Sequence, residues 1–229
     1  MCLDAESTTV NRHGGFADHV RCHWGWAIPL PASIDAVKSG ALFCGGITVF
    51  NPIIQCNVLP TERVGGIGIG GLGHMALQFL NKWGCEITAF TSSDAKHEEA
   101  MCLGAHHVVT SHDSNQLSKI AGSLDFIVCA ATASLPWDAI LNSLARQSRL
   151  HIVGVVQEPI PVAAFSLIGG QKSVSGSPVG SPYHQSKMIE FAARHAIATV
   201  VEEYPMSTVN DAVEHLRSGQ GKVSGGFAE

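Results

Sequence analysis

The sequence is poor in charged residues. Of its 229 residues, 14 are Lys or Arg and 19 are Asp or Glu, so 14% are charged, against roughly a quarter in an average globular domain. The net charge of −5 and the lack of a basic block argue against nucleic acid and a charged membrane surface as partners. The apolar share of 45% is enough for a sizeable core, so we expect one or two globular domains.

Long apolar runs and a secretory signal are also missing. No stretch reaches the roughly 18 apolar residues of a membrane-spanning helix. The first residues, Met1-Cys2-Leu3-Asp4, lack the basic and then apolar pattern of a signal peptide. These absences predict a soluble cytoplasmic protein without a membrane partner.

The cysteine pattern has no recognisable framework. The seven cysteines are odd in number, scattered, and never spaced Cys-x-x-Cys. This argues against a disulfide scaffold and against a self-contained zinc knuckle. We expect most of them to be small buried apolar side chains.

From residue 64 onward, short apolar runs alternate with longer amphipathic stretches, which is typical of βαβ units. We predict strands near 64–67, 86–91, 107–109, 125–129, 149–153 and 173–175, and helices near 72–83, 94–103, 137–144, 185–195 and 207–217. This order predicts an α/β fold with a Rossmann doubly wound parallel six-stranded sheet. Residues 34–56 are predicted to be helical, with breaks at Gly45-Gly46 and at Pro52.

One glycine-rich segment fits the pattern G-x-G-x-x-G and consists of Gly68, Ile69, Gly70, Gly71, Leu72 and Gly73. It follows a predicted strand and opens a predicted helix, as a dinucleotide-binding turn requires. Gly68 would permit the tight turn, Gly70 the approach of the pyrophosphate, and Gly73 the close packing of helix on strand. The alternative is a glycine-rich turn that binds no ligand, and the strand before it and the helix after it favour the dinucleotide-binding interpretation over this one.

The residues after the second predicted strand favour NADP over NAD. An NAD site places Asp or Glu about twenty residues after the glycines. This chain has Thr91, Ser92, Ser93 and Lys96 there. Three hydroxyls and a cation suit the 2′-phosphate of NADP. Asp94 weakens this preference, and Ser93 or Asp94 could equally cap the next helix.

Six segments occur in the same order in one known family. They are 12–18 (RHGGFAD), 44–49 (CGGITV), 68–74 (GIGGLGH), 171–181 (QKSVSGSPVGS), 191–195 (FAARH) and 201–206 (VEEYPM). Together they resemble the zinc-dependent medium-chain alcohol dehydrogenases, most closely the cinnamyl alcohol dehydrogenase-like branch of NADP-dependent aldehyde reductases. The resemblance implies hydride transfer between a nicotinamide and a zinc-bound primary alcohol or aldehyde.

The resemblance also implies contacts to the cofactor NADP. It puts the glycine turn on the pyrophosphate, and Thr91, Ser92, Ser93 and Lys96 on the 2′-phosphate side. It brings five residues toward the nicotinamide end: Thr48, Gly154, Ser177, Pro178 and Val179. Ala130 stands where this branch usually has Thr, so one hydroxyl contact is expected to be lost.

Cys44 resembles one ligand of the family's catalytic zinc. A zinc site of this class needs three protein ligands and an open position, and the resemblance places the other ligands and the proton relay in an N-terminal part without a counterpart here. A site rebuilt from Cys44 and two of His13, His19 and His23 is an alternative to ordinary structural histidines. The second function hypothesis is therefore a catalytically incomplete NADP-binding fragment without its own zinc chemistry.

The resemblance implies three regions. Residues 1–43 would be a remnant of a GroES-like catalytic domain, 44–181 the NADP-binding Rossmann domain, and 182–229 C-terminal helices that return to the catalytic domain. It also implies a homodimer joined near 173–181, where a bare edge strand tends to find a partner. The glycine-rich end, 223–229, puts the closing strand of the family in doubt.

Overall fold

The computed structural model describes residues 4, 6–7, 10–12, 14–218 and 225–228. The strands are β1 (Arg63–Ile67), β2 (Glu86–Thr91), β3 (His107–Thr110), β4 (Leu124–Cys129), β5 (Leu144–Ile152), β6 (Ser173–Gly176), β7 (Glu202–Pro205) and β8 (Gly225–Ala228). The α-helices are α1 (Ala36–Ser39), α2 (Gly45–Gln55), α3 (Gly73–Trp83), α4 (His97–Cys102), α5 (Ser114–Lys119), α6 (Trp137–Ser143), α7 (Ala164–Ile168), α8 (Pro182–His195) and α9 (Val209–Arg217). Four short 3₁₀ helices are η1 (Trp24–Trp26), η2 (Gly40–Phe43), η3 (Asp94–Lys96) and η4 (Met206–Thr208).

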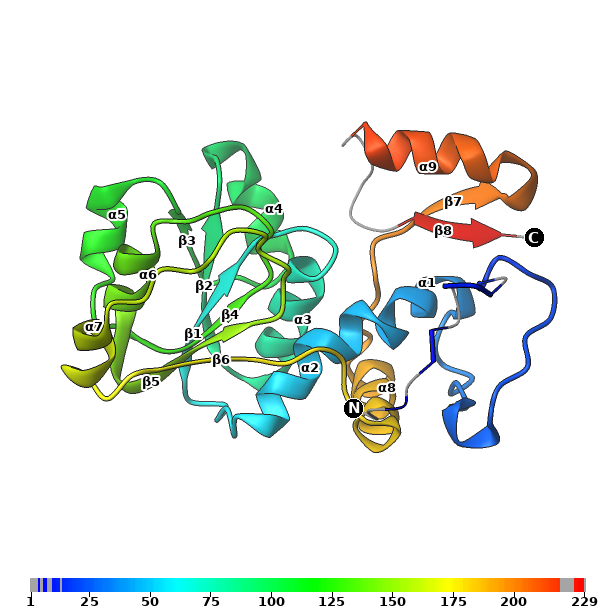
Figure 1. Cartoon of the computed structure of the whole chain (residues 1–229), viewed down its shortest axis with the longest axis horizontal. Helices are drawn as coiled ribbons and strands as arrows, with labels where there is room; N and C mark the ends of the chain where they lie inside the picture. The colour runs from blue at the N-terminus through cyan, green and yellow to red at the C-terminus, as the bar shows by residue number, and fades with distance from the viewer. Residues whose placement is uncertain (1–3, 5, 8–9, 13, 219–224, 229) are drawn as a thin grey trace.

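The first six strands form one parallel sheet in the order β3-β2-β1-β4-β5-β6. This is the doubly wound order of dinucleotide-binding folds, so the predicted α/β fold with a parallel six-stranded sheet is confirmed. The direction of winding reverses between β1 and β4. Figure 1 shows this sheet and its helices as one body, with α1, α9 and the β7–β8 pair as a second group and α2 and α8 between them.

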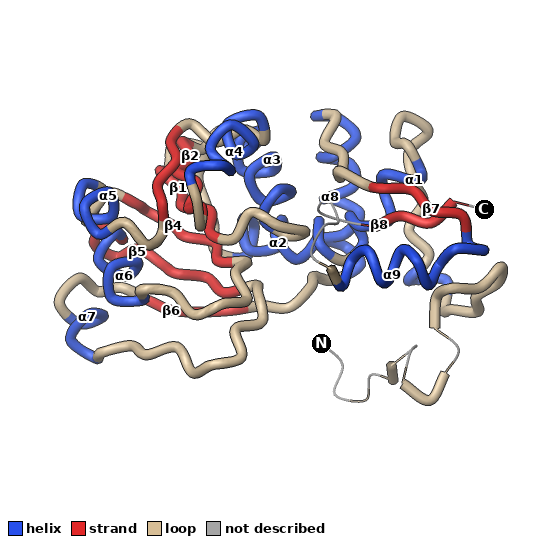
Figure 2. Tube along the Cα trace, turned by 90° about the horizontal axis from the view of Figure 1, so that it is seen from above, coloured by secondary structure: helices blue, strands red, loops and turns tan. Residues whose placement is uncertain are grey.

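Helices cover both faces of the sheet, and alternate strand residues supply two cores. On one face Val64, Ile87 and Phe126 pack with residues of α2, α3 and α8. On the other face Ile67 and Ile127 pack with residues of α5 and α6. Because both faces are buried, the central strands β1 and β4 carry a single charged residue each, whereas β5, nearer the edge of the sheet, is more polar. Figure 2 shows the same layered arrangement from above.

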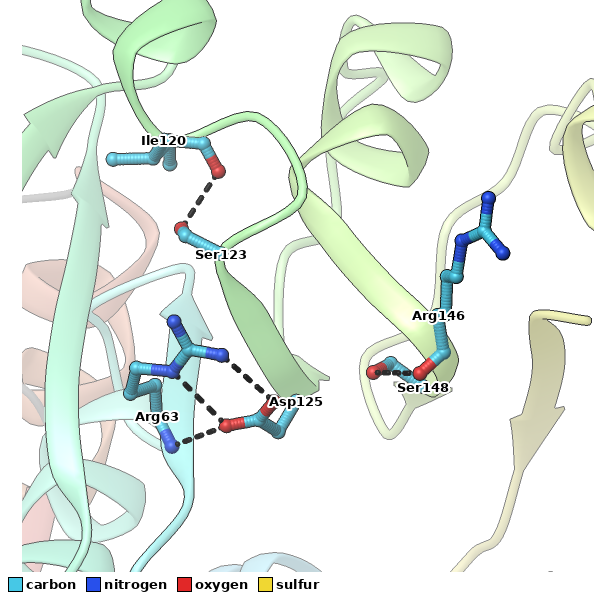
Figure 3. A network of polar contacts seen from close by, with 6 residues as sticks. All are labelled: Arg63, Ile120, Ser123, Asp125, Arg146 and Ser148. Atoms are coloured by element: carbon cyan, nitrogen blue, oxygen red, sulfur yellow. Dashed lines mark hydrogen bonds and ion pairs between the residues drawn. The ribbon is translucent and has the colours of Figure 1, made fainter. Parts of the chain in front are cut away.

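A bidentate ion pair joins the amino ends of the two central strands (Figure 3). The guanidinium of Arg63 donates to both carboxylate oxygens of Asp125 at 3.1 and 3.2 Å, and the Arg63 backbone N–H donates at 2.9 Å. Burial tends to raise the pKa of Asp125, but the Arg63 hydrogen bonds and charge outweigh it and lower the pKa. Ser123, just before β4, donates to the carbonyl of Ile120 at 2.7 Å. These contacts fix the amino ends of β1 and β4 and do not involve the carboxyl ends of the strands.

Three local expectations were wrong. Most cysteines were expected to be buried, but of the six that the structure describes only Cys85 and Cys129 are. The predicted break at Pro52 does not occur, because α2 runs through Pro52 to Gln55. A proline inside a helix costs one hydrogen bond, and the complete burial of neighbouring Phe50 and Ile53 offsets that cost. The doubted closing strand is present as β8, whose backbone pairs in parallel with β7.

No single helix among the described residues has both the length and the apolar composition to cross a membrane. One bent pair, Ala36–Phe43 with Gly45–Gln55, meets these criteria only when the two are taken together. Within that pair, α2 lies inside the first core, where Phe50 contacts Phe191 of α8 with ring centroids 5.5 Å apart.

Candidate functional site

A cleft of about 700 Å³ opens at the carboxyl ends of the central strands. It lies where the winding of the sheet reverses, which is the usual ligand position in open α/β sheets. Its lining includes Gly68, Ile69, Gly70, Gly71 and Leu72 after β1; Thr91, Ser92 and Lys96 at the end of β2; Ser111 and His112 after β3; residues 130–135 after β4; and Val153, Gly154 and Val155 after β5. Cys44 and Met75 line it as well.

Three glycines around this cleft are required by close backbone contacts. A Cβ on Gly68, whose φ is +85°, would lie 2.6 Å from the Ala131 nitrogen. A Cβ on Gly73 would lie 2.0 Å from the Gly68 carbonyl oxygen, and one on Gly154 would lie 2.3 Å from that of Ala131. The glycine turn, the start of α3 and the loop after β4 therefore meet with no room for side chains.

Gly70 differs from these three glycines. A Cβ there would meet no atom of the described residues within 4 Å, and Gly70 lines the cleft. The space is thus open directly above the backbone, next to the N-terminus of α3. The first N–H groups of a helix lack acceptors within it and attract anions. This part of the cleft fits the pyrophosphate of a dinucleotide.

The end of β2 fits the ribose end of a dinucleotide. Thr91 is 2% exposed, and its hydroxyl is a buried polar atom with no hydrogen-bond partner among the described residues. The Thr91 carbonyl accepts from the backbone and side chain of Ser111, at 2.8 and 3.0 Å. Ser92 and Lys96 line the same end of the cleft. A buried hydroxyl without a partner calls for one, and a ligand in this cleft would supply it.

The structure brings together nine of the fifteen residues predicted to bind the cofactor. Gly68, Ile69, Gly70, Gly71, Leu72, Thr91, Ser92, Lys96 and Gly154 line the cleft. Thr48, Gly73, Ser93, Ser177, Pro178 and Val179 lie outside its lining.

Several of these six residues have partners elsewhere in the protein. The Thr48 hydroxyl donates to the Cys44 carbonyl at 2.7 Å, and the Val179 carbonyl accepts from the Asn51 amide at 3.3 Å. Ser177 Oγ lies 2.9 Å from His151 Nε2. Gly73 packs directly against the Gly68 carbonyl oxygen and so holds the turn against the start of α3. A direct role of these residues toward the nicotinamide stays a prediction.

Sequence reasoning missed Ser111, His112 and most of the loop 130–135. Their common signal is position, because each directly follows a strand of the parallel sheet. The rule that ligands bind at the carboxyl ends of such strands could have found them. Ala130, where a hydroxyl was expected to be missing, lines the cleft, and so does the nearby hydroxyl residue Thr132.

The match to known proteins agrees with this geometry. A family model described as zinc-binding dehydrogenase matches residues 71–194, more than half of the chain. The chain belongs to the zinc-binding dehydrogenase family. It is 47% identical over 220 residues to the aldehyde reductase AdhA of Synechocystis, a match that covers 96% of this chain and 66% of that protein.

Solved structures of two cinnamyl alcohol dehydrogenases are similar to this chain. A cinnamyl alcohol dehydrogenase from Sorghum bicolor matches with a TM-score of 0.81 and 32% identity, over 87% of this chain and 57% of that one. A cinnamyl alcohol dehydrogenase from Helicobacter pylori, complexed with NADP(H), matches with a TM-score of 0.71 and 25% identity, over 83% and 54%. The predicted cinnamyl alcohol dehydrogenase-like resemblance is confirmed. The chain spans less than two thirds of the length of each of these three proteins.

The name of the zinc-binding dehydrogenase family implies a metal, but the described residues do not fit one. No group of three or more His, Cys, Asp or Glu side chains in that part of the chain could hold a metal ion. Cys44 is exposed and lines the cleft. His23 Nδ1 instead accepts from the Gly25 N–H at 3.2 Å, and His13 lies outside the described residues.

Proposed function

We propose that this protein binds NADP(H) in the cleft and acts as an NADP-dependent alcohol dehydrogenase or aldehyde reductase. One observation carries the nucleotide part: a single cleft combines open backbone at Gly70, a buried Thr91 hydroxyl that has no partner among the described residues, and a cation at Lys96. The activity part is supported by the aldehyde reductase and cinnamyl alcohol dehydrogenases that the chain resembles.

Each part of the cleft would hold a different part of the nucleotide. The glycine turn and the start of α3 would bind the pyrophosphate through backbone N–H groups. Ser92 and Lys96 would bind the 2′-phosphate, and Thr91 would donate to the adenosine ribose. Gly154, which leaves no room for a side chain, would let the nicotinamide end approach the end of β5. A bound nicotinamide supplies the hydride donor or acceptor.

A second candidate function is nucleotide binding without zinc chemistry in this chain. The observation that favours it is the donor set: Cys44 lies at the cleft with no group of further ligands around it in the described residues. Oxidation of NADPH by an aromatic aldehyde with added zinc tests the two candidates, with a Cys44→Ala variant as control. A rate that the variant abolishes supports the enzyme, whereas NADPH binding without any rate supports the second candidate.

Lys96→Ala should weaken NADPH binding by about tenfold and leave NADH binding within twofold. The lysine would pair with the 2′-phosphate, which NADH lacks, and a charge-assisted hydrogen bond contributes roughly 1.5–3 kcal/mol. Titration of each nucleotide by calorimetry measures this ratio. Lys119→Ala, a change at the end of α5 outside the cleft lining, is the matched control. An equal loss for both nucleotides would contradict the assignment of NADP.

We also infer a homodimer formed by pairing at β6. This strand ends the six-stranded sheet, so one of its sides has no neighbouring strand in the described part of the chain. Open edges of this kind tend to pair with another strand. Light scattering coupled to size-exclusion chromatography should give twice the mass of the chain. A Val174→Pro variant, which removes a backbone donor within β6, should shift the protein to monomer, and a monomeric parent protein would overturn the inference.

A further inference from the structure

The second residue of α3, the helix after the glycine turn, is a buried histidine that has no role in the proposed nucleotide contacts. His74 is fully buried. Its Nδ1 lies 3.1 Å from the carbonyl oxygen of Gly70, and its Nε2 lies 3.3 Å from the backbone nitrogen of Val200. The ring therefore bridges the turn and the segment 198–200, which connects α8 to β7.

The two partners fix the tautomer of this ring. The backbone N–H of Val200 can only donate, so Nε2 of His74 accepts. The ring proton is then on Nδ1, which donates to the Gly70 carbonyl. Burial is the main cause that lowers the pKa of His74, and this favours the neutral ring.

The bond to Gly70 orients a peptide group of the turn. The Gly70 carbonyl accepts both from the ring and from the backbone N–H of His74, the latter at 3.0 Å. In a trans peptide the N–H of the next residue points away from this carbonyl. With its carbonyl held toward α3, the peptide directs the N–H of Gly71 to the opposite side, and Gly71 lines the cleft.

The segment on the other side of the ring is itself held in place. Gln78, one turn after His74 on α3, donates to the Ala198 carbonyl at 3.1 Å. The Thr199 hydroxyl donates to the carbonyl of Lys38 at the end of α1. Three successive residues, 198–200, thus contact α3 or α1, and the ring has a fixed point of attachment.

We propose that His74 is a positioning residue for the dinucleotide, which holds the Gly70–Gly71 peptide so that the Gly71 N–H faces the phosphate. Val200 serves this role by fixing the tautomer and orientation of the ring. The proposal rests on the proposed binding of NADP(H) and adds a residue that does not itself contact the nucleotide.

Two amide variants separate the two contacts. In His74→Asn the side-chain amide takes the position of Nδ1, so it keeps the bond to Gly70 and loses that to Val200. In His74→Gln the amide takes the position of Nε2, so it keeps Val200 and loses Gly70. We expect the dissociation constant for NADPH to stay within about twofold in His74→Asn and to rise roughly tenfold in His74→Gln. Lys82→Ala, on the exposed side of the same helix, should change nothing.

Amide hydrogen exchange of the nucleotide-free protein checks the bridge independently. The Val200 amide should exchange faster in His74→Asn than in His74→Gln, and equal rates would overturn the bridge. Losses of NADPH affinity that are equal in both variants, in step with their stability, would make His74 a core residue only and overturn the proposal. If the parent protein binds no NADPH, the proposed function fails first, before any variant is compared, and this inference fails with it.

Discussion

Gly70→Ala should leave the protein folded and weaken NADPH binding on the order of a hundredfold, or about 2.7 kcal/mol. The new methyl group would meet no atom within 4 Å in the described part of the chain. It would instead occupy the space above the turn that the pyrophosphate needs. The free energy of unfolding should rise slightly, by less than about 1 kcal/mol, because alanine restricts the unfolded chain. Calorimetric titration and urea denaturation measure the two effects.

Two further alanine variants make this result specific. Gly40→Ala adds the same methyl group in open space outside the cleft, and it should leave NADPH binding unchanged. Gly73→Ala puts a Cβ 2.0 Å from the Gly68 carbonyl oxygen, so it should destabilise the fold by about 3 kcal/mol. Unchanged NADPH affinity in Gly70→Ala would show that the pyrophosphate does not lie on this turn.

Acidification should destabilise the protein through His151, by about 3 kcal/mol between pH 6.5 and pH 4. Burial, and to a lesser extent the charge of Arg149, lowers the pKa of His151 from 6.5 to about 4. In this range the unfolded chain binds a proton that the folded protein does not. The free energy of unfolding therefore falls as the pH falls through 6.5, and this loss levels off below about pH 4.

The surroundings of His151 explain why its charged form is disfavoured. The ring is 2% exposed, and it stacks on Phe126 at a centroid distance of 6.2 Å. Its Nδ1 and Nε2 each lie 2.9 Å from a serine hydroxyl, of Ser175 and Ser177. These neutral hydroxyls offer no negative charge to an imidazolium.

A His151→Gln variant isolates this contribution from the other titrating groups. The amide can still bond to one of the two hydroxyls but takes up no proton. Urea denaturation at several pH values should give a smaller loss of stability between pH 6.5 and 4 in the variant than in the parent protein. His74, whose pKa is also lowered by burial, is present in both proteins and cancels in the difference. Parallel pH profiles would contradict the assignment.

Much of the fold could be predicted because its signals are local. The strand expected at 86–91 is β2 with the same bounds, and the helix expected at 72–83 differs from α3 by one residue. Helix α3 is recognised by the spacing of its apolar residues and by its end at Gly84, whose φ is +111°. Both signals lie within the helix or directly after it in the sequence. Helices α5 and α7 were missed because six and five residues are too few to show a helical period.

Apart from Gly154, which the family resemblance indicated, the candidate site was predicted only where its residues are close in sequence. The glycine turn and the group Thr91, Ser92 and Lys96 follow strands whose ends the sequence reveals. Ser111 and His112 join this group because β3 lies beside β2, a pairing of residues about twenty apart that no local pattern contains. The zinc prediction at Cys44 depended on resemblance, and the described residues bring no set of ligands to it.

The sequence by itself determined the parallel α/β fold and the place of the glycine turn at the end of the first strand, because each depends on residue types at short spacing. Only the tertiary structure decided at which glycines near the cleft a side chain would collide with backbone atoms, and that Gly70 has open space beside it. Gly68, Gly73 and Gly154 face backbone atoms that the sheet brings together, whereas Gly70 faces the cleft. The contact of His74 with Val200 spans 126 residues, and it exists only because α3 packs against the segment after α8.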